Sequence, residues 1–128
     1  GDKKIRYDLS IQIEGDDSDG INDARILCFD WLVFTCGENH AMDMLWHDNR
    51  LFADIDPGVR ARWFSFVNQS LKRSGKQYIA SLNTENFNAM ETTLSEIEML
   101  ELKSKIVLTL RGDKAENKLL GIQFGSKK

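Results

Sequence analysis

Two groups of polar residues follow apolar runs, and their side chains are of types that bind phosphate or metal ions. His47, Asp48 and Asn49 end one run, and Asn83 and Thr84 end another. A carboxylate at the end of a buried strand can hold Mg²⁺ through water molecules. The alternative role of Asp48 is structural, because an aspartate at this point can cap the next turn.

The two apolar runs have the length of short buried strands. They span residues 42–46 and 77–82, and one helix of crossover length is expected between them. A strand–helix–strand order predicts adjacent parallel strands joined by a right-handed connection. In such a sheet, function sits in the loops after the carboxyl ends of the strands. We therefore expect Asp48 and Asn83 to lie close together at one edge of the sheet, with Ser18 well away from them.

Two helices are expected beside these strands. Residues 21–36 are nearly continuously apolar, which predicts a long and largely buried helix. Asp56 and Pro57 are typical of the start of a second helix, because aspartate is a good N-cap and proline suits the first helical position. Gly75 is expected to end this helix. The three tryptophans sit in apolar surroundings and are predicted to be core residues: Trp31, Trp46 and Trp63.

The ends of the chain add further predicted strands. Residues 5–13 alternate between apolar and polar side chains, which predicts a strand with one buried face. Residues 106–110 and 119–124 predict a C-terminal β-hairpin, whereas residues 84–99 are ambiguous. The predicted fold is α/β, a layered sheet with parallel core strands flanked by helices. We expect three layers and a single domain over residues 1–128.

Composition excludes several functional classes. The 128 residues are 41% hydrophobic and 29% charged, which is typical of a globular domain, and the net charge of −3 argues against a strongly basic nucleic-acid footprint. No apolar run approaches the ~20 residues of a transmembrane helix. Cys28 and Cys36 are eight residues apart on a predicted helix, about 12 Å, which is too far for a disulfide. They are expected to be small buried residues of a reduced, cytoplasmic protein.

Other catalytic constellations are poorly represented. His40, His47 and Asp48 could bind a metal, but no further suitably spaced partner and no C-x-x-C accompanies them, so structural histidines are favoured. The sequence has no G-x-S-x-G motif of a serine hydrolase. A stand-alone small hydrolase therefore has no support among the residues.

Several segments, taken in order, resemble the motifs of a known ATPase class. Residues 18–22, Ser-Asp-Gly-Ile-Asn, resemble the signature motif of ABC-type ATPases, and residues 44–48, Met-Leu-Trp-His-Asp, resemble a Walker B strand. The segment that ends at Asp56 resembles a D-loop, and residues 78–83 resemble the strand that carries the switch residue. Together they are similar to the C-terminal half of an ATPase head of the SMC type, the coiled-coil chromosome and repair ATPases.

A more specific resemblance comes from three longer segments. Residues 45–52, 77–83 and 118–122 are similar to the YydD-like bacterial family. That family carries a C-terminal domain of unknown function behind a predicted coiled coil. The resemblance covers nearly the whole chain and implies that these residues form a lobe of a longer protein.

The resemblance implies roles for six residues. Ser18 and Gly20 would touch the γ-phosphate of a nucleotide held by an opposing head, although Ser18 could instead be only a loop or capping residue. Asp48 would bind the hydration shell of Mg²⁺, and Asp56 would contact the partner head. Two positions depart from the pattern: Asn49 replaces the catalytic glutamate, and Asn83 replaces the switch histidine. An amide cannot accept a proton at neutral pH, so slow turnover is expected.

The phosphate-binding loop is missing from the chain. No G-x-x-x-x-G-K-[ST] motif occurs, so ATP and Mg²⁺ are expected only with an N-terminal lobe, and this part alone should be inactive. The implied partners are that N-terminal lobe, a second head in a homodimer and, through the full-length protein, DNA, with no membrane. The full-length protein would be a slow ATPase in a DNA-related or defence-associated system. The alternative is a protein-interaction module with degenerate nucleotide chemistry.

Overall fold

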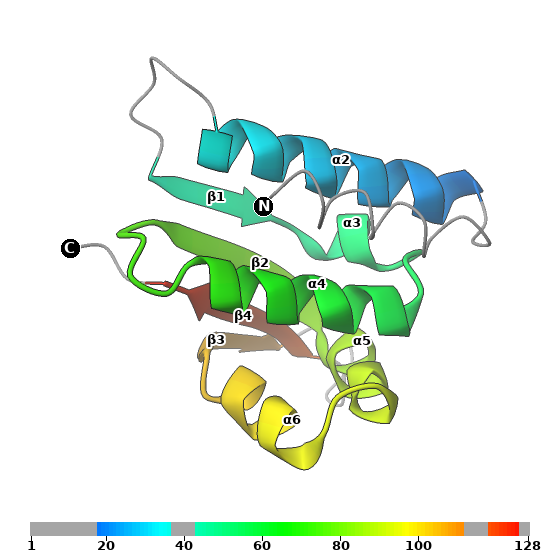
Figure 1. The fold of residues 1–128 in the computed structure, drawn as a ribbon. Helices are drawn as coiled ribbons and strands as arrows, with labels where there is room; N and C mark the ends of the chain where they lie inside the picture. The colour runs from blue at the N-terminus through cyan, green and yellow to red at the C-terminus, as the bar shows by residue number, and fades with distance from the viewer. Residues whose placement is uncertain (1–17, 37–42, 112–117, 126–128) are drawn as a thin grey trace.

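The chain folds into one mixed sheet with helices packed against it (Figure 1). The computed structural model describes residues 18–36, 43–111 and 118–125, so the strand predicted at residues 5–13 lies outside the described residues. The elements are α2 (Ser18–Cys36), β1 (Met44–His47), α3 (Asn49–Phe52), α4 (Pro57–Ser70), β2 (Gln77–Asn83), α5 (Thr84–Asn88), the 3-10 helix η1 (Ala89–Thr92), α6 (Glu96–Lys103), β3 (Ile106–Arg111) and β4 (Lys118–Phe124).

The four described strands lie in the order β1-β2-β4-β3. β1 pairs in parallel with β2, with Leu45 opposite Tyr78, and this confirms the predicted parallel neighbours. β4 runs antiparallel to both β2 and β3, and the β3–β4 pair confirms the predicted C-terminal hairpin. The fold is therefore mixed α/β, and its parallel part consists of β1 and β2.

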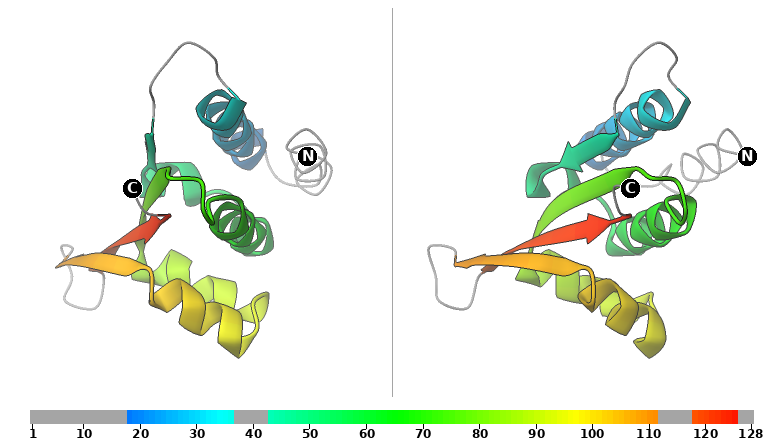
Figure 2. Two further views of the ribbon diagram at one scale, coloured as in Figure 1. Left: turned by 60° about the vertical axis from the view of Figure 1, so that its left-hand side comes forward. Right: turned by 90° about the vertical axis from the view of Figure 1, so that its left-hand side faces the viewer.

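The described helices all cover the same face of this sheet (Figure 2). Along β2, the side chains of Tyr78, Ala80 and Leu82 are buried beneath the helices, while the alternate residues are only half-buried. The prediction of three layers is wrong for the part of the chain that the structure describes, which has two. Buried side chains alternate with more exposed ones along β2 and β4, as expected for a sheet with one covered face.

The uncovered face of the sheet carries apolar side chains. Trp46 is 57% exposed there, so the expectation that all three tryptophans are core residues fails at this one. Met44, two residues earlier on β1, points to the same face and is also exposed. Trp31 and Trp63 are buried, because they lie on α2 and α4 and face each other with ring centroids 5.6 Å apart.

Helix α2 confirms the predicted long helix but is only partly buried. One stripe of the helix packs into the core and includes Leu27, Trp31 and Phe34. Another stripe remains exposed although it is apolar; it consists of Ile26, Phe29 and Val33. The two cysteines of this helix are not joined in a disulfide, and only Cys28 is buried, whereas Cys36 is exposed at the helix end.

Helix α4 begins as the sequence predicts. The Asp56 carboxylate accepts hydrogen bonds from the backbone N–H groups of Gly58 at 2.9 Å and Val59 at 3.3 Å, and Pro57 is the first helical residue. The predicted end is wrong, because α4 stops at Ser70. Gly75 instead has a positive φ of 75° in the turn that leads into β2.

Replacement of Asp56 by Ala is expected to lower the free energy of unfolding by about 1 kcal/mol, because two N–H groups at the start of α4 lose their acceptor. Asp56→Asn is the matched control, since its amide oxygen can accept the same bonds. Urea denaturation of both variants measures the difference. Equal stability of Asp56→Ala and the native chain would contradict a capping role.

The ambiguous region, residues 84–99, contains several short helical segments. α5 and η1 follow β2 directly, and α6 begins after Ser95. Ser95 and Glu98 form a capping box, in which each side chain accepts a hydrogen bond from the backbone N–H of the other residue. Across residues 18–36, 43–111 and 118–125, no helix has both the length and the apolar character needed to cross a membrane.

Candidate functional site

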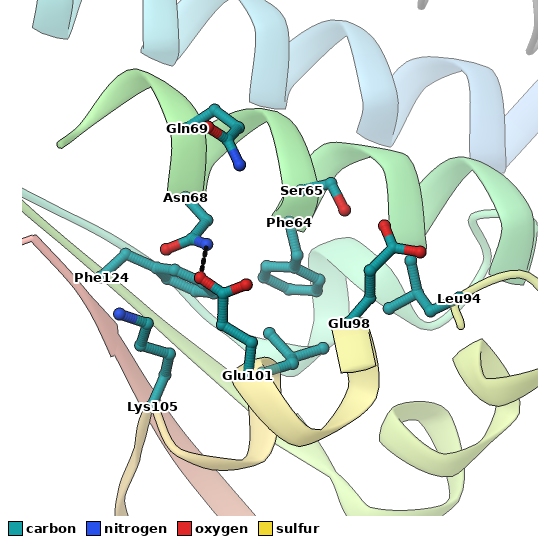
Figure 3. A pocket seen from close by; sticks show the side chains of 10 residues that line it. Phe64, Ser65, Asn68, Gln69, Leu94, Glu98, Glu101, Lys105 and Phe124 are labelled. Carbon is teal, nitrogen blue, oxygen red and sulfur yellow. Dashed lines mark hydrogen bonds between the residues drawn. The ribbon is translucent and has the colours of Figure 1, made fainter. Parts of the chain in front are cut away.

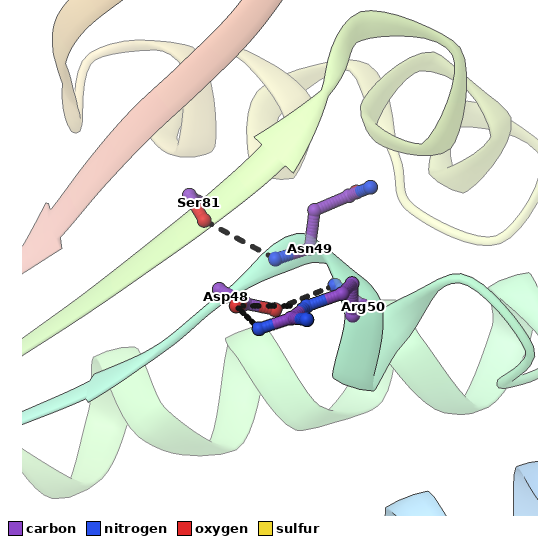
Figure 4. Close-up of polar contacts among 4 residues, drawn as sticks. All are labelled: Asp48, Asn49, Arg50 and Ser81. Carbon is purple, nitrogen blue, oxygen red and sulfur yellow. Dashed lines mark hydrogen bonds and ion pairs between the residues drawn. The ribbon is translucent and has the colours of Figure 1, made fainter.

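The carboxyl ends of β1 and β2 are connected by the side chain of Asn49. Its amide oxygen Oδ1 accepts a hydrogen bond from the backbone N–H of Asn83 at 3.0 Å and from Nδ2 of Asn86 at 3.1 Å. The backbone N–H of Asn49 donates to the hydroxyl of Ser81 at 3.1 Å (Figure 4). Asn49 therefore joins the two strand ends directly.

Asn83 has its own capping role in this arrangement. It precedes α5, and its Oδ1 accepts a hydrogen bond from the backbone N–H of Asn86 at 2.7 Å. Since Oδ1 of both Asn49 and Asn83 is an acceptor, Nδ2 of each amide is the donor that remains for other molecules. Two N–H donors at one edge of the sheet suit the oxygen atoms of an anion.

Asp48 lies beside the amide cluster, which consists of Asn49, Asn83 and Asn86, and it caps α3. Its Oδ1 accepts from the backbone N–H of Arg50 at 2.8 Å, and its Oδ2 pairs with the Arg50 guanidinium at 3.1 Å (Figure 4). The hydrogen bond from the Arg50 side chain holds the pKa of Asp48 below its usual value. The carboxylate is therefore ionised at neutral pH and could bind a cation, although both oxygens already have a partner.

The three other predicted site residues lie at helix starts. Ser18 is the first residue of α2, and Gly20 is buried in the first turn. α2 runs antiparallel to β1, so its first turn lies on the side of the sheet toward which β1 points (Figure 1). Asp56 is the N-cap of α4, and its carboxylate is engaged by that helix. The structure thus joins Asn49 with Asn83, places Asp48 directly before Asn49 in the chain, and gives Asp56 a capping role.

Replacement of Asn49 by Leu is expected to lower the free energy of unfolding by about 2 kcal/mol, because two half-buried N–H donors lose their acceptor. Asn49→Asp is the matched control, since a carboxylate oxygen can accept both bonds and should preserve most of the stability. Chemical denaturation distinguishes the two. A loss of similar size in both variants would show that the amide oxygen is not the stabilising group.

A second polar network lies in the core, where four side chains are joined by hydrogen bonds: Asp30, His47, Trp63 and Tyr78. His47 is buried, its Nε2 lies 2.7 Å from the Asp30 carboxylate of α2, and its Nδ1 lies 2.7 Å from the Tyr78 hydroxyl. Trp63 Nε1–H also donates to the Tyr78 oxygen, at 3.1 Å. The arrangement is satisfied when Tyr78 donates to Nδ1 and the neutral imidazole donates from Nε2 to Asp30. Both ring nitrogens have protein partners, which supports the structural role predicted for His47.

Acidification is expected to destabilise the fold through His47. Burial lowers the pKa of His47 below its usual 6.5, and the hydrogen bond that its imidazole donates to Asp30 only partly opposes this. The unfolded chain then binds the proton more readily than the folded chain does. The contribution of neutral His47 to the free energy of unfolding is therefore fully present above pH 6.5, and it declines as the pH falls from there through the folded pKa. Urea midpoints between about pH 7.5 and about pH 5.5 measure the slope.

The second histidine of the chain provides the control for this pH dependence. His47→Gln should remove most of the slope in that range, whereas His40→Gln should retain it. His40 lies outside the described residues. A slope that disappears with His40→Gln and persists with His47→Gln would refute the assignment.

A buried arginine, Arg60, donates a hydrogen bond to the backbone of Asn86 in the amide cluster. Arg60 of α4 donates from Nη1 to the backbone oxygen of Asn86 at 2.7 Å and from Nη2 to that of Ile55 at 2.9 Å. Its side chain is only 3% exposed, and burial lowers its pKa from the usual value. Arg60 therefore ties α5 and the segment before Asp56 to α4.

A separate pocket of about 250 Å³ lies between α4 and α6 (Figure 3). Its acidic residues have partners, since Glu101 accepts from Nδ2 of Asn68 at 2.8 Å and Glu98 belongs to the capping box with Ser95. Both carboxylates of the pocket are therefore engaged in hydrogen bonds within the protein. Within residues 18–36, 43–111 and 118–125, no group of three or more His, Cys, Asp or Glu side chains is arranged to hold a metal ion.

Comparison with known proteins identifies the family. A family described as uncharacterised proteins conserved in bacteria, DUF2326, matches residues 1–124. The chain belongs to this family. No curated protein and no solved structure matches the chain. The expectation of a bacterial domain of unknown function is thereby confirmed.

Three residues of the DUF2326 domain were not predicted as parts of its polar networks. They are Asp30, Ser81 and Asn86. Asp30 had a visible signal, because it is the only charged residue between Leu27 and Phe34 in an apolar helix. Asn86 follows Asn83 by three residues, the spacing of a helix cap and the N–H group that it accepts from.

Proposed function

We propose that this DUF2326 domain is the C-terminal lobe of an SMC-like, ABC-type ATPase head. It would supply signature, Walker B, D-loop and switch-like positions for the ATP-dependent dimerisation of two heads. The observation that supports this most is the hydrogen bond of 3.0 Å between Asn49 and Asn83. It joins the carboxyl ends of two adjacent parallel strands, where ligands bind in open α/β sheets.

The chemistry of the site fits phosphate and Mg²⁺ in the proposed head. The free Nδ2 donors of Asn49 and Asn83 can hydrogen-bond phosphate oxygens or orient a water molecule. The Asp48 carboxylate can hold the hydration shell of Mg²⁺ when Arg50, whose side chain is exposed, turns away from it. Ser18 and Gly20, in the first turn of α2, would meet the γ-phosphate of the nucleotide on the second head.

ATP would bind only after this lobe joins an N-terminal lobe, because the phosphate-binding loop is absent from these residues. The proposed partners are therefore that lobe, a second head and, through the full-length protein, DNA. A cytoplasmic location and a DNA-related or defence-associated role belong to the same proposal. We expect no ATP hydrolysis by residues 1–128 alone.

Sedimentation of the full-length protein with and without Mg²⁺-ATP tests the proposal. We expect ATP-dependent dimers, weaker nucleotide binding in Asp48→Ala, and loss of dimers with retained nucleotide binding in Ser18→Arg. Ser70→Arg is the control, because it adds the same charge at an exposed position at the end of α4. A full-length protein that does not respond to ATP, or a lobe that hydrolyses ATP by itself, would overturn the proposal.

A protein-interaction module with degenerate nucleotide chemistry is the second candidate. It is favoured by the internal bonding of the site, since Arg50 engages both oxygens of Asp48, and Asn83 and Asn86 both donate to Asn49 Oδ1. This candidate predicts that Asp48→Ala changes stability but leaves nucleotide affinity and dimerisation unaltered. The same sedimentation experiment separates the two functions.

A further inference from the structure

A second pocket, of about 260 Å³, lies at the amino end of β2. Three segments that are distant in the sequence line it: the turn after α4, the residue before β3, and the end of β4. Their cationic side chains are Lys72, Arg73 and Lys105, which we call the basic cluster, and no carboxylate of the described residues lines this pocket. β2 is about 20 Å long and separates the pocket from Asn83 at its carboxyl end.

The backbone holds these three segments together. The N–H of Gln123 donates to the backbone oxygen of Lys105 at 2.9 Å, which ties this residue to β4. Gly125 has a positive φ of 74°, and a Cβ atom there would clash with the backbone oxygen of Lys76. The end of β4 therefore lies directly against the turn after α4, and the two form opposite walls of the pocket.

The carbonyl groups at the end of α4 have partners other than the basic cluster. The backbone oxygen of Val67 accepts from the N–H of Leu71 at 3.1 Å, and that of Leu71 accepts from both the N–H and the hydroxyl of Ser74, at 3.2 and 3.0 Å. Within residues 18–36, 43–111 and 118–125, no hydrogen bond or ion pair engages the side chains of the basic cluster. Its like charges therefore repel one another until an anion binds between them.

The backbone conformation of Arg73 supports a binding role for its side chain. In the described part of the chain, Arg73 is the only residue other than glycine with a positive φ, of 66°. The left-handed conformation that follows a helix is usually taken by glycine, because a Cβ atom is strained there. An arginine thus serves the turn less well than a glycine would, and its guanidinium stays available for a ligand.

We infer that this pocket binds the phosphate group of a small phosphorylated molecule, at a site separate from the proposed nucleotide site. The guanidinium of Arg73 can donate two parallel hydrogen bonds to phosphate oxygens, and Lys72 and Lys105 supply compact positive charges from two sides. The side-chain amide of Gln123, which also lines the pocket, can donate a further bond.

The distribution of charge favours a small ligand over a nucleic acid. Nucleic acids bind along extended basic surfaces that bury about 1,000 Å² or more of protein. Here the net charge of the chain is −3, and the three cations gather at one pocket. The neighbouring pocket between α4 and α6 carries Glu98 and Glu101 (Figure 3), which would repel a phosphate backbone that continued in that direction.

Amide NMR spectra of the protein, titrated with inorganic phosphate and with pyrophosphate, test the inference. We expect saturable shifts of the Gly75 and Gly125 signals. Lys72→Ala/Arg73→Ala should weaken binding by at least about tenfold, because a hydrogen bond to a charged group contributes this much or more. Arg25→Ala/Lys118→Ala is the matched control, because it removes the same two residue types from exposed positions of α2 and β4 and should leave the affinity unaltered.

Arg73→Gly separates phosphate binding from folding. Glycine accepts a positive φ without strain, so the urea midpoint of this variant should equal or exceed that of the native chain. Its affinity for pyrophosphate should still fall by at least about tenfold, since the guanidinium is lost.

Four results would overturn the inference. In the first, neither phosphate nor pyrophosphate gives saturable shifts. In the second, Lys72→Ala/Arg73→Ala or Arg73→Gly keeps the native affinity. In the third, the control variant loses as much affinity as Lys72→Ala/Arg73→Ala, which would show attraction by net charge alone. In the fourth, a single-stranded oligonucleotide shifts the same signals at concentrations where pyrophosphate does not, which would assign the pocket to nucleic acid. None of these measurements uses ATP, so the proposed ATPase function can fail or hold independently.

Discussion

Replacement of Tyr78 by Phe is expected to lower the free energy of unfolding by about 3 kcal/mol, because two buried groups lose their hydrogen-bond partner at once. The Tyr78 hydroxyl lies 2.7 Å from His47 Nδ1 and 3.1 Å from Trp63 Nε1. Its side chain is fully buried, so no water can take its place without entering the core. Burial also raises the pKa of Tyr78, which keeps the hydroxyl protonated as the network requires.

Chemical denaturation of Tyr78→Phe, Trp63→Phe and the double variant measures this effect. The double variant should be less destabilised than the sum of the two single variants, because removing both partners leaves no orphaned indole N–H. Additive losses would mean that the two side chains do not share the hydroxyl. A Tyr78→Phe variant as stable as the native chain would show that the network contributes nothing to folding.

Local sequence signals predicted the secondary structure near the site well. The apolar run at residues 77–82 and the second hairpin segment at residues 119–124 predicted β2 and β4, and the Asp56-Pro57 pair predicted the start of α4. These signals succeed because short apolar runs and helix capping are local properties. The parallel pairing of β1 with β2 followed from the single helix between them.

The arrangement of the layers could not be predicted in the same way. Whether a sheet is covered on one face or two depends on where every helix packs, and the apolar residues Met44 and Trp46 suggested burial on both faces of β1. The end of α4 was also misplaced. Gly75 has the positive φ expected of a glycine after a helix, but it lies in the turn before β2, five residues after α4 ends.

The positions of Asn49 and Asn83 at the strand ends were predicted, but their hydrogen bonds were not. Asn49 and Asn83 were expected at the carboxyl ends of neighbouring strands, and they lie there in direct contact. The partners Asn86 and Ser81 were not predicted, since each bond joins residues more than thirty positions apart. The ion pair between Asp48 and Arg50 is local, and the capping alternative considered for Asp48 correctly describes its contacts.

Replacement of Asn49 by Glu in the full-length protein is expected to accelerate ATP hydrolysis by about 10²- to 10⁴-fold, because it restores a general base where the proposed head has an amide. Asn49 is the first residue of α3, directly after Asp48, and its Oδ1 faces Asn83 and Asn86. A glutamate is one methylene longer, so its carboxylate can reach beyond these two donors toward a water molecule. Asn49→Asp should give a smaller gain, because its shorter carboxylate replaces Oδ1 and remains bound to them.

Steady-state ATPase rates of the full-length protein, measured together with ATP-dependent dimerisation, test this prediction. Asn88→Glu is the control, because it makes the same change at an exposed position of α5 and should leave the rate unaltered. If Asn49→Glu dimerises with ATP but hydrolyses it no faster, the water molecule does not lie beside residue 49 and the glutamate-like role of this position is wrong. A rate that rises with Asn49→Glu and falls again when Asp48→Ala is added would place the base and the Mg²⁺ ligand in one site. The reason is that an acceleration that needs both side chains cannot come from a change in net charge alone.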